Sequence, residues 1–300
     1  MGRARIRWHL RLLPVLLTVA AAAASAQDEA TAQAHSDGLL FELTAPAGGA
    51  PSWLFATIHS EDPRVLRLPE PVTAALAAAD ALVLEVVPDA ASVRSAARAM
   101  RLPGSTELAD LVPLELYRRC EQALAARGLP DSLPRKLKPW AVMTMLSMPP
   151  ARTGEFLDRH LYQWAQANAT PTVGLETTAE QLAVFEQLRP EEQQALLRAA
   201  VATQGERERL FEALIGAYLR GALGELLALS EDRVPGLEPT LQHRLRELLI
   251  DSRNRRMLMR IRTLPAQRRH FIAVGALHLP GARGLLAGLE AAGYSVRRLH

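Results

Sequence analysis

The sequence has 300 residues, of which 49% are hydrophobic and 22% are charged, and these values are ordinary for a globular protein. They exclude a fibrous or an intrinsically disordered chain, and the length is sufficient to bury a sizeable core. The formal net charge is +3, but without the four arginines of residues 1–26 the chain has 31 basic and 32 acidic residues, so we expect no general attraction to nucleic acid or to an anionic membrane.

The first residues have the three-part pattern of a secretory signal peptide. Four arginines precede an apolar run from Leu12 to Ala24, and Ala24, Ser25 and Ala26 offer small residues for cleavage. The run is too short to favour a membrane span, although a retained N-terminal anchor is the alternative. We therefore expect residues 1–26 to be a signal peptide, residues 27–37 a flexible leader and residues 38–300 one domain of a secreted or periplasmic protein with no stable membrane span.

The elements predicted along the chain indicate an α/β protein. Short apolar runs predict strands at residues 38–43, 53–58, 81–87, 171–175, 271–274 and 295–299. Helical spacing predicts helices at residues 69–79, 113–127, 139–148, 156–167, 206–229, 238–262 and 284–292. Strands near both ends with helices between them predict a central β-sheet from N- and C-terminal strands with a large helical insertion.

Cys120 is the only cysteine, so no internal disulfide is possible. It lies within a helical pattern, and a free cysteine in that setting is more often a packed core residue than a nucleophile. We expect it to be buried in the helix of residues 113–127.

Four of the strand-like runs lead directly into an ionisable residue. These residues are His59, Glu85, Glu176 and His278. In an open α/β sheet, ligands bind at the carboxyl ends of the strands. If the four strands are parallel neighbours, two imidazoles and two carboxylates therefore meet at one edge.

Glu85 indicates what kind of chemistry such an edge supports. It is flanked by apolar residues on both sides, and an ionised carboxylate in such surroundings needs a cation or hydrogen-bond donors. Imidazole and carboxylate ligands suit Mn, Co or Zn, and a bound divalent metal makes its water a usable hydroxide near neutral pH.

Each of these residues also has a structural alternative. His59 could cap the following segment, and His278 could donate to a backbone carbonyl. Glu85 could pair with a buried arginine such as Arg253, and Glu176 could interact with the N-terminus of the next helix. Arg253 could bind a substrate carboxylate or an oxyanion, but it is surrounded by other arginines, a pattern that by itself favours a solvated helix face.

No nucleophile elbow, Walker loop, His-Glu-x-x-His helix or Cys-x-x-Cys is present. Seven stretches, taken in this order, resemble the TraB/GumN family, which includes Tiki-like proteins and is related to erythromycin-esterase-like and ChaN-like proteins. The stretches are residues 53–60, 68–85, 137–141, 156–158, 174–181, 253–254 and 274–278.

The resemblance implies a metal site formed by His59, Glu85 and His278, because the family is marked by two Gly-x-x-His motifs and an acidic residue. It places Glu176 and Arg253 nearby, and it implies metal-dependent protease activity for Tiki-like members. One departure is Ala56, which stands where the first motif has glycine, and an added methyl group there crowds any close backbone approach.

The leading hypothesis is therefore a periplasmic, metal-dependent hydrolase of a peptide or small acyl substrate. His59 and His278 are expected as metal ligands, Glu85 as a ligand or general base, Glu176 in the other of these two roles, and Arg253 as the group that holds the substrate or the oxyanion. One alternative is a non-catalytic protein that binds a metal or a haem-like ligand, and another is a protein-interaction module that uses the arginine-rich helix. The substrate and the oligomeric state stay open.

Overall fold

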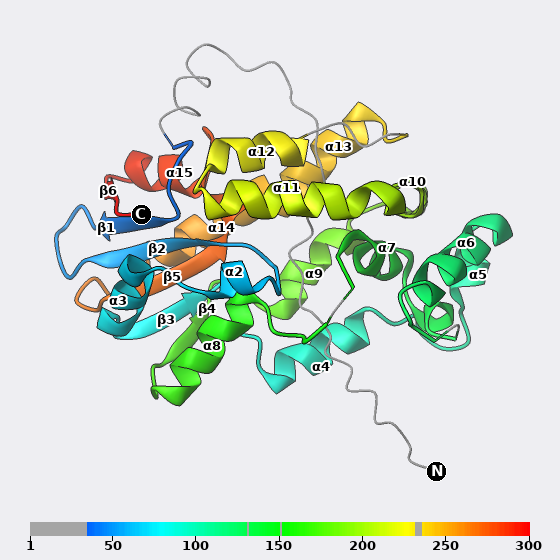
Figure 1. The fold of residues 1–300 in the computed structure, drawn as a ribbon, viewed down its shortest axis with the longest axis horizontal. Helices are drawn as coiled ribbons and strands as arrows, with labels where there is room; N and C mark the ends of the chain where they lie inside the picture. Colours follow the sequence, from blue (N-terminus) through cyan, green and yellow to red (C-terminus); the bar gives the residue numbers. More distant parts are fainter. Residues whose placement is uncertain (1–34, 131, 151, 232–235) are drawn as a thin grey trace.

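The structure is a computed structural model that describes residues 35–130, 132–150, 152–231 and 236–300 (Figure 1). The predicted signal peptide and residues 27–34 of the predicted leader lie outside the described residues. Within the described ranges, no helix combines the length and the apolar character that crossing a membrane requires.

A six-stranded mixed sheet forms the centre of the protein, in the order β4-β3-β5-β2-β1-β6. The strands are β1 (Leu40–Thr44), β2 (Ser52–Thr57), β3 (Ala81–Leu84), β4 (Thr172–Gly174), β5 (His270–Gly275) and β6 (Ser295–Arg298). Strands β4, β3, β5 and β2 run parallel to one another, whereas β1 is antiparallel to both β2 and β6. The predicted α/β fold with a sheet built from both ends of the chain is confirmed.

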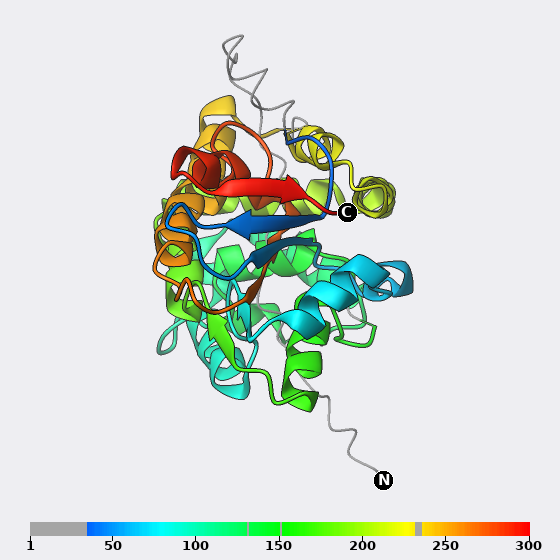
Figure 2. The ribbon, with the colours of Figure 1, turned by 90° about the vertical axis from the view of Figure 1, so that its left-hand side faces the viewer.

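The helices and helical turns of the described residues surround this sheet. They are α2 (Pro63–Leu66), α3 (Glu70–Ala78), α4 (Ala90–Ala99), α5 (Leu108–Leu111), α6 (Leu114–Ala125), η1 (Pro134–Lys136), α7 (Pro139–Ser147), α8 (Leu157–Ala167), α9 (Thr178–Glu186), α10 (Pro190–Ala202), η2 (Gln204–Glu206), α11 (Arg207–Leu219), α12 (Leu223–Glu231), α13 (Pro239–Arg246), η3 (Glu247–Asp251), α14 (Ser252–Ile261), η4 (Ala276–His278) and α15 (Leu285–Ala291). Figure 2 shows α14 and α15 on one face of the sheet and α3 and α11 on the other.

The buried apolar side chains form two clusters. The larger cluster joins the sheet to α3, α8, α11, α12, α14 and α15. The second lies within α4–α7, α9, α10 and α13, which extend to one side of the sheet in Figure 1. Cys120 belongs to this second cluster and is fully buried in α6, as predicted. The helical insertion therefore has a core of its own.

The strand predicted at residues 81–87 ends at Leu84, and two predicted helices are interrupted in the structure. The helix predicted at residues 206–229 is broken at Gly221, which adopts a φ of +69°, and the amides of Gly221 and Ala222 donate to carbonyl groups of the preceding turn. Glycine adopts this conformation without the steric cost that a side chain would add, so it ends α11. The helix predicted at residues 238–262 contains the π-helical turn η3 between α13 and α14.

Candidate functional site

The four strands that lead into ionisable residues are parallel neighbours with aligned carboxyl ends. Thr57 of β2 pairs with Gly275 of β5, and Leu84 of β3 pairs with Ala273 of β5 and with Gly174 of β4. The segments that follow these strands carry His59, His278, Glu85 and Glu176, and all four side chains are buried. The sheet therefore brings the predicted residues to one edge.

Arg253 of α14 lies at the centre of three of these side chains. Its Nη2 is 2.5 Å from Oε2 of Glu85 and 2.7 Å from Oε2 of Glu176, and its Nε donates to the same Glu176 oxygen at 2.8 Å. Its Nη1 is 3.2 Å from Nε2 of His278. The side chain is 5% exposed, so the solvated helix face that the sequence pattern favoured is wrong.

Arg253 follows the π-helical turn η3 and lies on the buried face of α14. A π-helical turn has more residues than an α-helical turn, so it rotates the residues that follow it relative to a regular 3.6-residue repeat. After η3, the buried positions of α14 are Arg253, Asn254, Met257 and Ile261. The neighbouring arginines were a poor guide, because Arg255 and Arg262 are exposed whereas Arg253 is buried.

Glu85 is held as an ionised carboxylate. Its Oε1 accepts a hydrogen bond from the backbone N–H of Gly275 at 2.6 Å, and its Oε2 accepts one from Nε2 of Gln181 at 3.2 Å. Burial opposes ionisation, but the charges of Arg253 and His278 and these hydrogen bonds outweigh it and lower the pKa of Glu85 to about 2. Gly275 matters here because a Cβ at this position would lie 3.1 Å from the carboxylate.

His278 is a neutral imidazole with a defined tautomer. The amide nitrogen of Asn254 donates to the carbonyl groups of His278 and Arg283, so the amide oxygen faces Nδ1 of His278 at 2.6 Å. That oxygen can only accept, so Nδ1 carries the proton and Nε2 has the lone pair. Burial lowers the pKa of His278 to about 4, with Glu85 opposing and Arg253 adding to the shift. Nε2 lies 3.7 Å from Oε1 of Glu85.

Glu176 anchors the guanidinium group rather than facing open space. Its side chain is 0% exposed, and its Oε1 accepts a hydrogen bond from Nη1 of Arg256 at 2.6 Å while Oε2 binds Arg253. The next residue, Thr177, caps α9 through a capping box with Glu180. The carboxylate of Glu176 thus fixes where α14 lies relative to β4.

His59 has a different immediate environment at the end of β2. Its Nδ1 is 3.6 Å from Oδ2 of Asp158, and Asp158 also accepts a hydrogen bond from the Thr57 hydroxyl at 3.1 Å. The ring of Phe156 packs against the imidazole with a centroid separation of 3.8 Å. The hydroxyl of Tyr218 donates to the carbonyl of Ala56 at 2.9 Å. These contacts join His59 to the start of α8.

Several of these residues were not assigned a role by sequence reasoning. Asp158 and Gln181 lie in stretches that resemble the family, and Asn254 follows Arg253, so their positions carried a signal. The sequence did not indicate their roles, because each role depends on a contact with a segment far away in the sequence. Arg256 was treated only as one of the arginines that surround Arg253.

The predicted metal requires several donor side chains that converge on one point. Glu85 and His278 supply two donor atoms at 3.7 Å, but in the part of the chain that the structure describes no three His, Cys, Asp or Glu side chains are grouped to hold a metal ion. The two carboxylates of Glu85 and Glu176 already face the two guanidinium groups of Arg253 and Arg256. A divalent cation added to this balanced set would leave two positive charges in excess, which is costly in a buried site. As arranged, these residues do not fit the metal.

The model of the TraB/PrgY/gumN family matches residues 39–298, which include the whole sheet and every residue of the site. No curated protein and no solved structure matches the chain.

Proposed function

Because the chain belongs to the TraB/PrgY/gumN family, we propose that it is an exported hydrolase of peptides or related acyl compounds that acts at the carboxyl ends of its four parallel strands. The observation that supports this proposal is the meeting of Glu85, Arg253 and His278 in one buried cluster. A carboxylate, a guanidinium group and a neutral imidazole there offer a proton acceptor and an oxyanion donor to one substrate.

The proposed roles follow from the protonation states. Nε2 of His278 and Oε1 of Glu85 are 3.7 Å apart, a separation that one attacking water can bridge. The water oxygen forms the new bond to the acyl carbon, and its proton passes to Nε2 of His278, which later returns it to the leaving group. Arg253 donates an N–H to the oxyanion. Glu176, Arg256 and Asn254 are positioning residues, because they hold Arg253 and His278.

The predicted Mn, Co or Zn stays a prediction. Its three expected ligands are His59, Glu85 and His278, and the side-chain roles proposed above do not depend on it. Elemental mass spectrometry of residues 27–300, beside a His59→Ala/His278→Ala double variant, checks the metal directly. Stoichiometric metal that is lost in the double variant would establish the ion and would overturn the metal-free roles proposed above.

The experiment for the hydrolase is a screen of residues 27–300 against peptide and ester libraries, with products identified by mass spectrometry. His278→Ala is expected to lower kcat at least ~100-fold, as removal of a general base does. The matched control is His270→Ala, because His270 is a buried histidine at the other end of β5. Equal activity of His278→Ala and the unaltered protein would contradict the proposal.

A second candidate function is ligand binding without turnover. It is favoured by the mutual pairing of Arg253 with Glu85 and Glu176, which leaves the charges of the cluster satisfied in the absence of substrate. A ligand that is retained on purification, lost in Arg253→Met and never hydrolysed would support this candidate over the hydrolase.

A further inference from the structure

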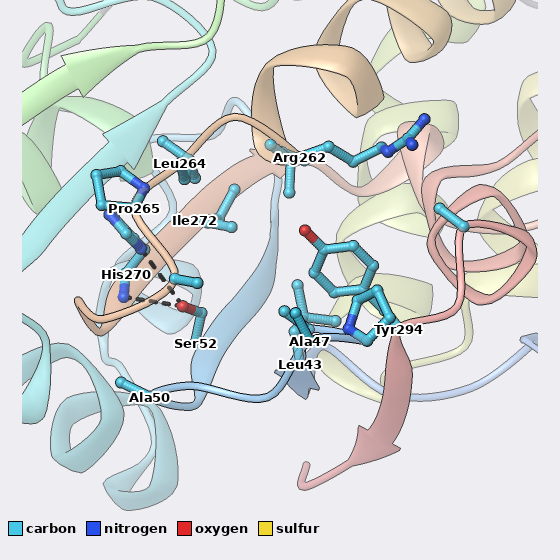
Figure 3. A pocket seen from close by; sticks show the side chains of 15 residues that line it. Leu43, Ala47, Ala50, Ser52, Arg262, Leu264, Pro265, His270, Ile272 and Tyr294 are labelled. Atoms are coloured by element: carbon cyan, nitrogen blue, oxygen red, sulfur yellow. Dashed lines mark hydrogen bonds between the residues drawn. The ribbon is translucent and has the colours of Figure 1, made fainter.

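A pocket of about 260 Å³ lies at the amino ends of β2 and β5, opposite the candidate site. It is bounded by the β1–β2 loop (residues 45–51), by residues 262–269 between α14 and β5, by residues 292–294 between α15 and β6, and by the adjoining ends of these elements (Figure 3). Ser52 and His270 begin β2 and β5, whereas Thr57 and Gly275 end these strands beside the candidate site. The pocket and the candidate site therefore lie at opposite ends of these two adjacent strands.

Backbone contacts hold two of its walls together. The amide of Ala50 donates to the carbonyl of Ala266 at 2.9 Å. Gly49 allows this approach, because it has a φ of +125° and a Cβ there would lie 2.3 Å from the same carbonyl oxygen. The β1–β2 loop and the segment before β5 are thus joined directly.

The third wall is fixed by the end of α15. Gly293 adopts a φ of +85°, and a Cβ on it would lie 3.2 Å from Pro46. The amide of Tyr294 donates to the carbonyl of Leu289 at 3.0 Å, which closes the helix end. As Figure 3 shows, the Tyr294 hydroxyl points into the pocket towards Ile272.

The lining is apolar with few polar groups. Its polar side chains are Ser52, His270, Tyr294 and Arg262, and it contains no aspartate or glutamate. The backbone N–H of His270 donates to the Ser52 hydroxyl at 3.1 Å. Burial and the nearby charge of Arg268 lower the pKa of His270, so the imidazole is uncharged at neutral pH. The exposed Arg262 carries the one charge of the lining, and no acidic side chain of the described residues forms an ion pair with it.

We propose that this pocket binds a small monocarboxylate with an apolar body, such as an aryl or branched-chain acid. The body lies between Ile272 and Tyr294, and the carboxylate pairs with Arg262. A planar guanidinium group matches a carboxylate in shape and charge. The volume equals that of roughly nine waters at about 30 Å³ each, which suits a ligand of about ten non-hydrogen atoms. The proposal does not depend on the function of the strand-end cluster.

Three probes of similar shape test the proposed charge preference: benzoate, benzyl alcohol and benzylamine. Each is titrated into ¹⁵N-labelled protein, and the amide signals of Gly48, Gly49 and Gly293 report on the pocket. The amides of Gly174 and Gly275 report on the strand-end cluster. We expect benzoate to shift the pocket signals and to bind at least about fivefold more tightly than benzyl alcohol, with benzylamine the weakest, because one exposed ion pair contributes about 1 kcal/mol.

Two variants separate the contributions of charge and shape. Arg262→Met is expected to weaken benzoate about fivefold and to leave benzyl alcohol within about twofold, since only the ion pair is lost. Arg255→Met, at an exposed arginine of α14, the helix that ends just before Arg262, is the matched control and leaves both affinities unchanged. Ala47→Phe places a ring in the pocket and is expected to abolish both.

Three results would overturn the proposal. The first is that benzoate and benzyl alcohol bind equally. The second is that benzoate shifts only Gly174 and Gly275, which would place it at the strand-end cluster. The third is that Arg262→Met leaves the affinity for benzoate unchanged. Because the Arg262 side chain is exposed, this variant is expected to fold, and its amide spectrum checks that directly.

Discussion

Replacing Arg253 by methionine removes the cation that two buried carboxylates share. Glu85 is 8% exposed and Glu176 is 3% exposed, and Nη2 of Arg253 contacts both within 2.7 Å. Removing one partner of a buried ion pair leaves the other charge uncompensated, at a cost of about 3–5 kcal/mol. We therefore expect Arg253→Met to lose that much of its free energy of unfolding near neutral pH.

The loss in free energy of unfolding is expected to depend on pH, and the direction follows from the pKa of Glu85. The folded pKa of Glu85 is lowered from 4.5 to about 2, so in the unaltered protein its contribution is complete above its unfolded pKa and is lost as the pH falls towards 2. A shift of that size corresponds to about 3 kcal/mol. Without Arg253, burial dominates and raises the pKa of Glu85. The ionised carboxylate of Glu85 then destabilises the folded variant. The difference in free energy of unfolding between the variant and the unaltered protein therefore becomes smaller as the pH is lowered.

Urea unfolding followed by tryptophan fluorescence at about pH 7.5 and about pH 5 measures both effects. The control is Arg255→Met on the same helix, whose ion pair with Glu247 is exposed and is expected to contribute less than about 1 kcal/mol. The reasoning is refuted if Arg253→Met loses less than about 1 kcal/mol, or if its deficit is the same at both pH values.

Three further predictions concern the rest of the fold. Burial raises the pKa of Cys120 to about 12, so a thiol reagent at neutral pH should label it only after urea unfolds the protein, and rapid native labelling would contradict this. In Gly284→Ala the new Cβ would lie 2.2 and 2.4 Å from two backbone oxygens, so we expect a loss of about 2–4 kcal/mol in urea unfolding, whereas Gly205→Ala, with no atom within 4 Å, should stay within about 1 kcal/mol. Thr177→Ala removes the N-cap that pairs with Glu180 and should cost about 1 kcal/mol by the same measurement; an unchanged midpoint would show that the capping box contributes nothing.

The sheet and the edge at which the candidate residues meet were predictable from the sequence. Buried parallel strands read as short apolar runs, and their carboxyl ends are where ionisable residues interrupt those runs. This reasoning found His59, Glu85, Glu176 and His278 at one edge. It works because both signals are local in the sequence.

The arrangement within that edge was not predictable in the same way. Arg253 is buried because Glu85 and Glu176, from two distant segments, pair with it, whereas the arginines around it in the sequence indicated a solvated face. Asp158 and Asn254 lie beside histidines that are 99 and 24 residues away from them, respectively. Contacts of this kind depend on how the helical insertion packs, which periodicity does not encode.

The central position of β5 bears on when this chain can fold during synthesis. Its residues 270–275 lie between β2 and β3, so these two earlier strands share a neighbour that is made almost last. β1 likewise takes one of its partners, β6, from residues 295–298. Loop closure over more than two hundred residues is slow compared with the formation of local helices. The helical insertion, with its own apolar core, can therefore collapse early, while the sheet and the cluster at its edge assemble only after nearly the whole chain has been made.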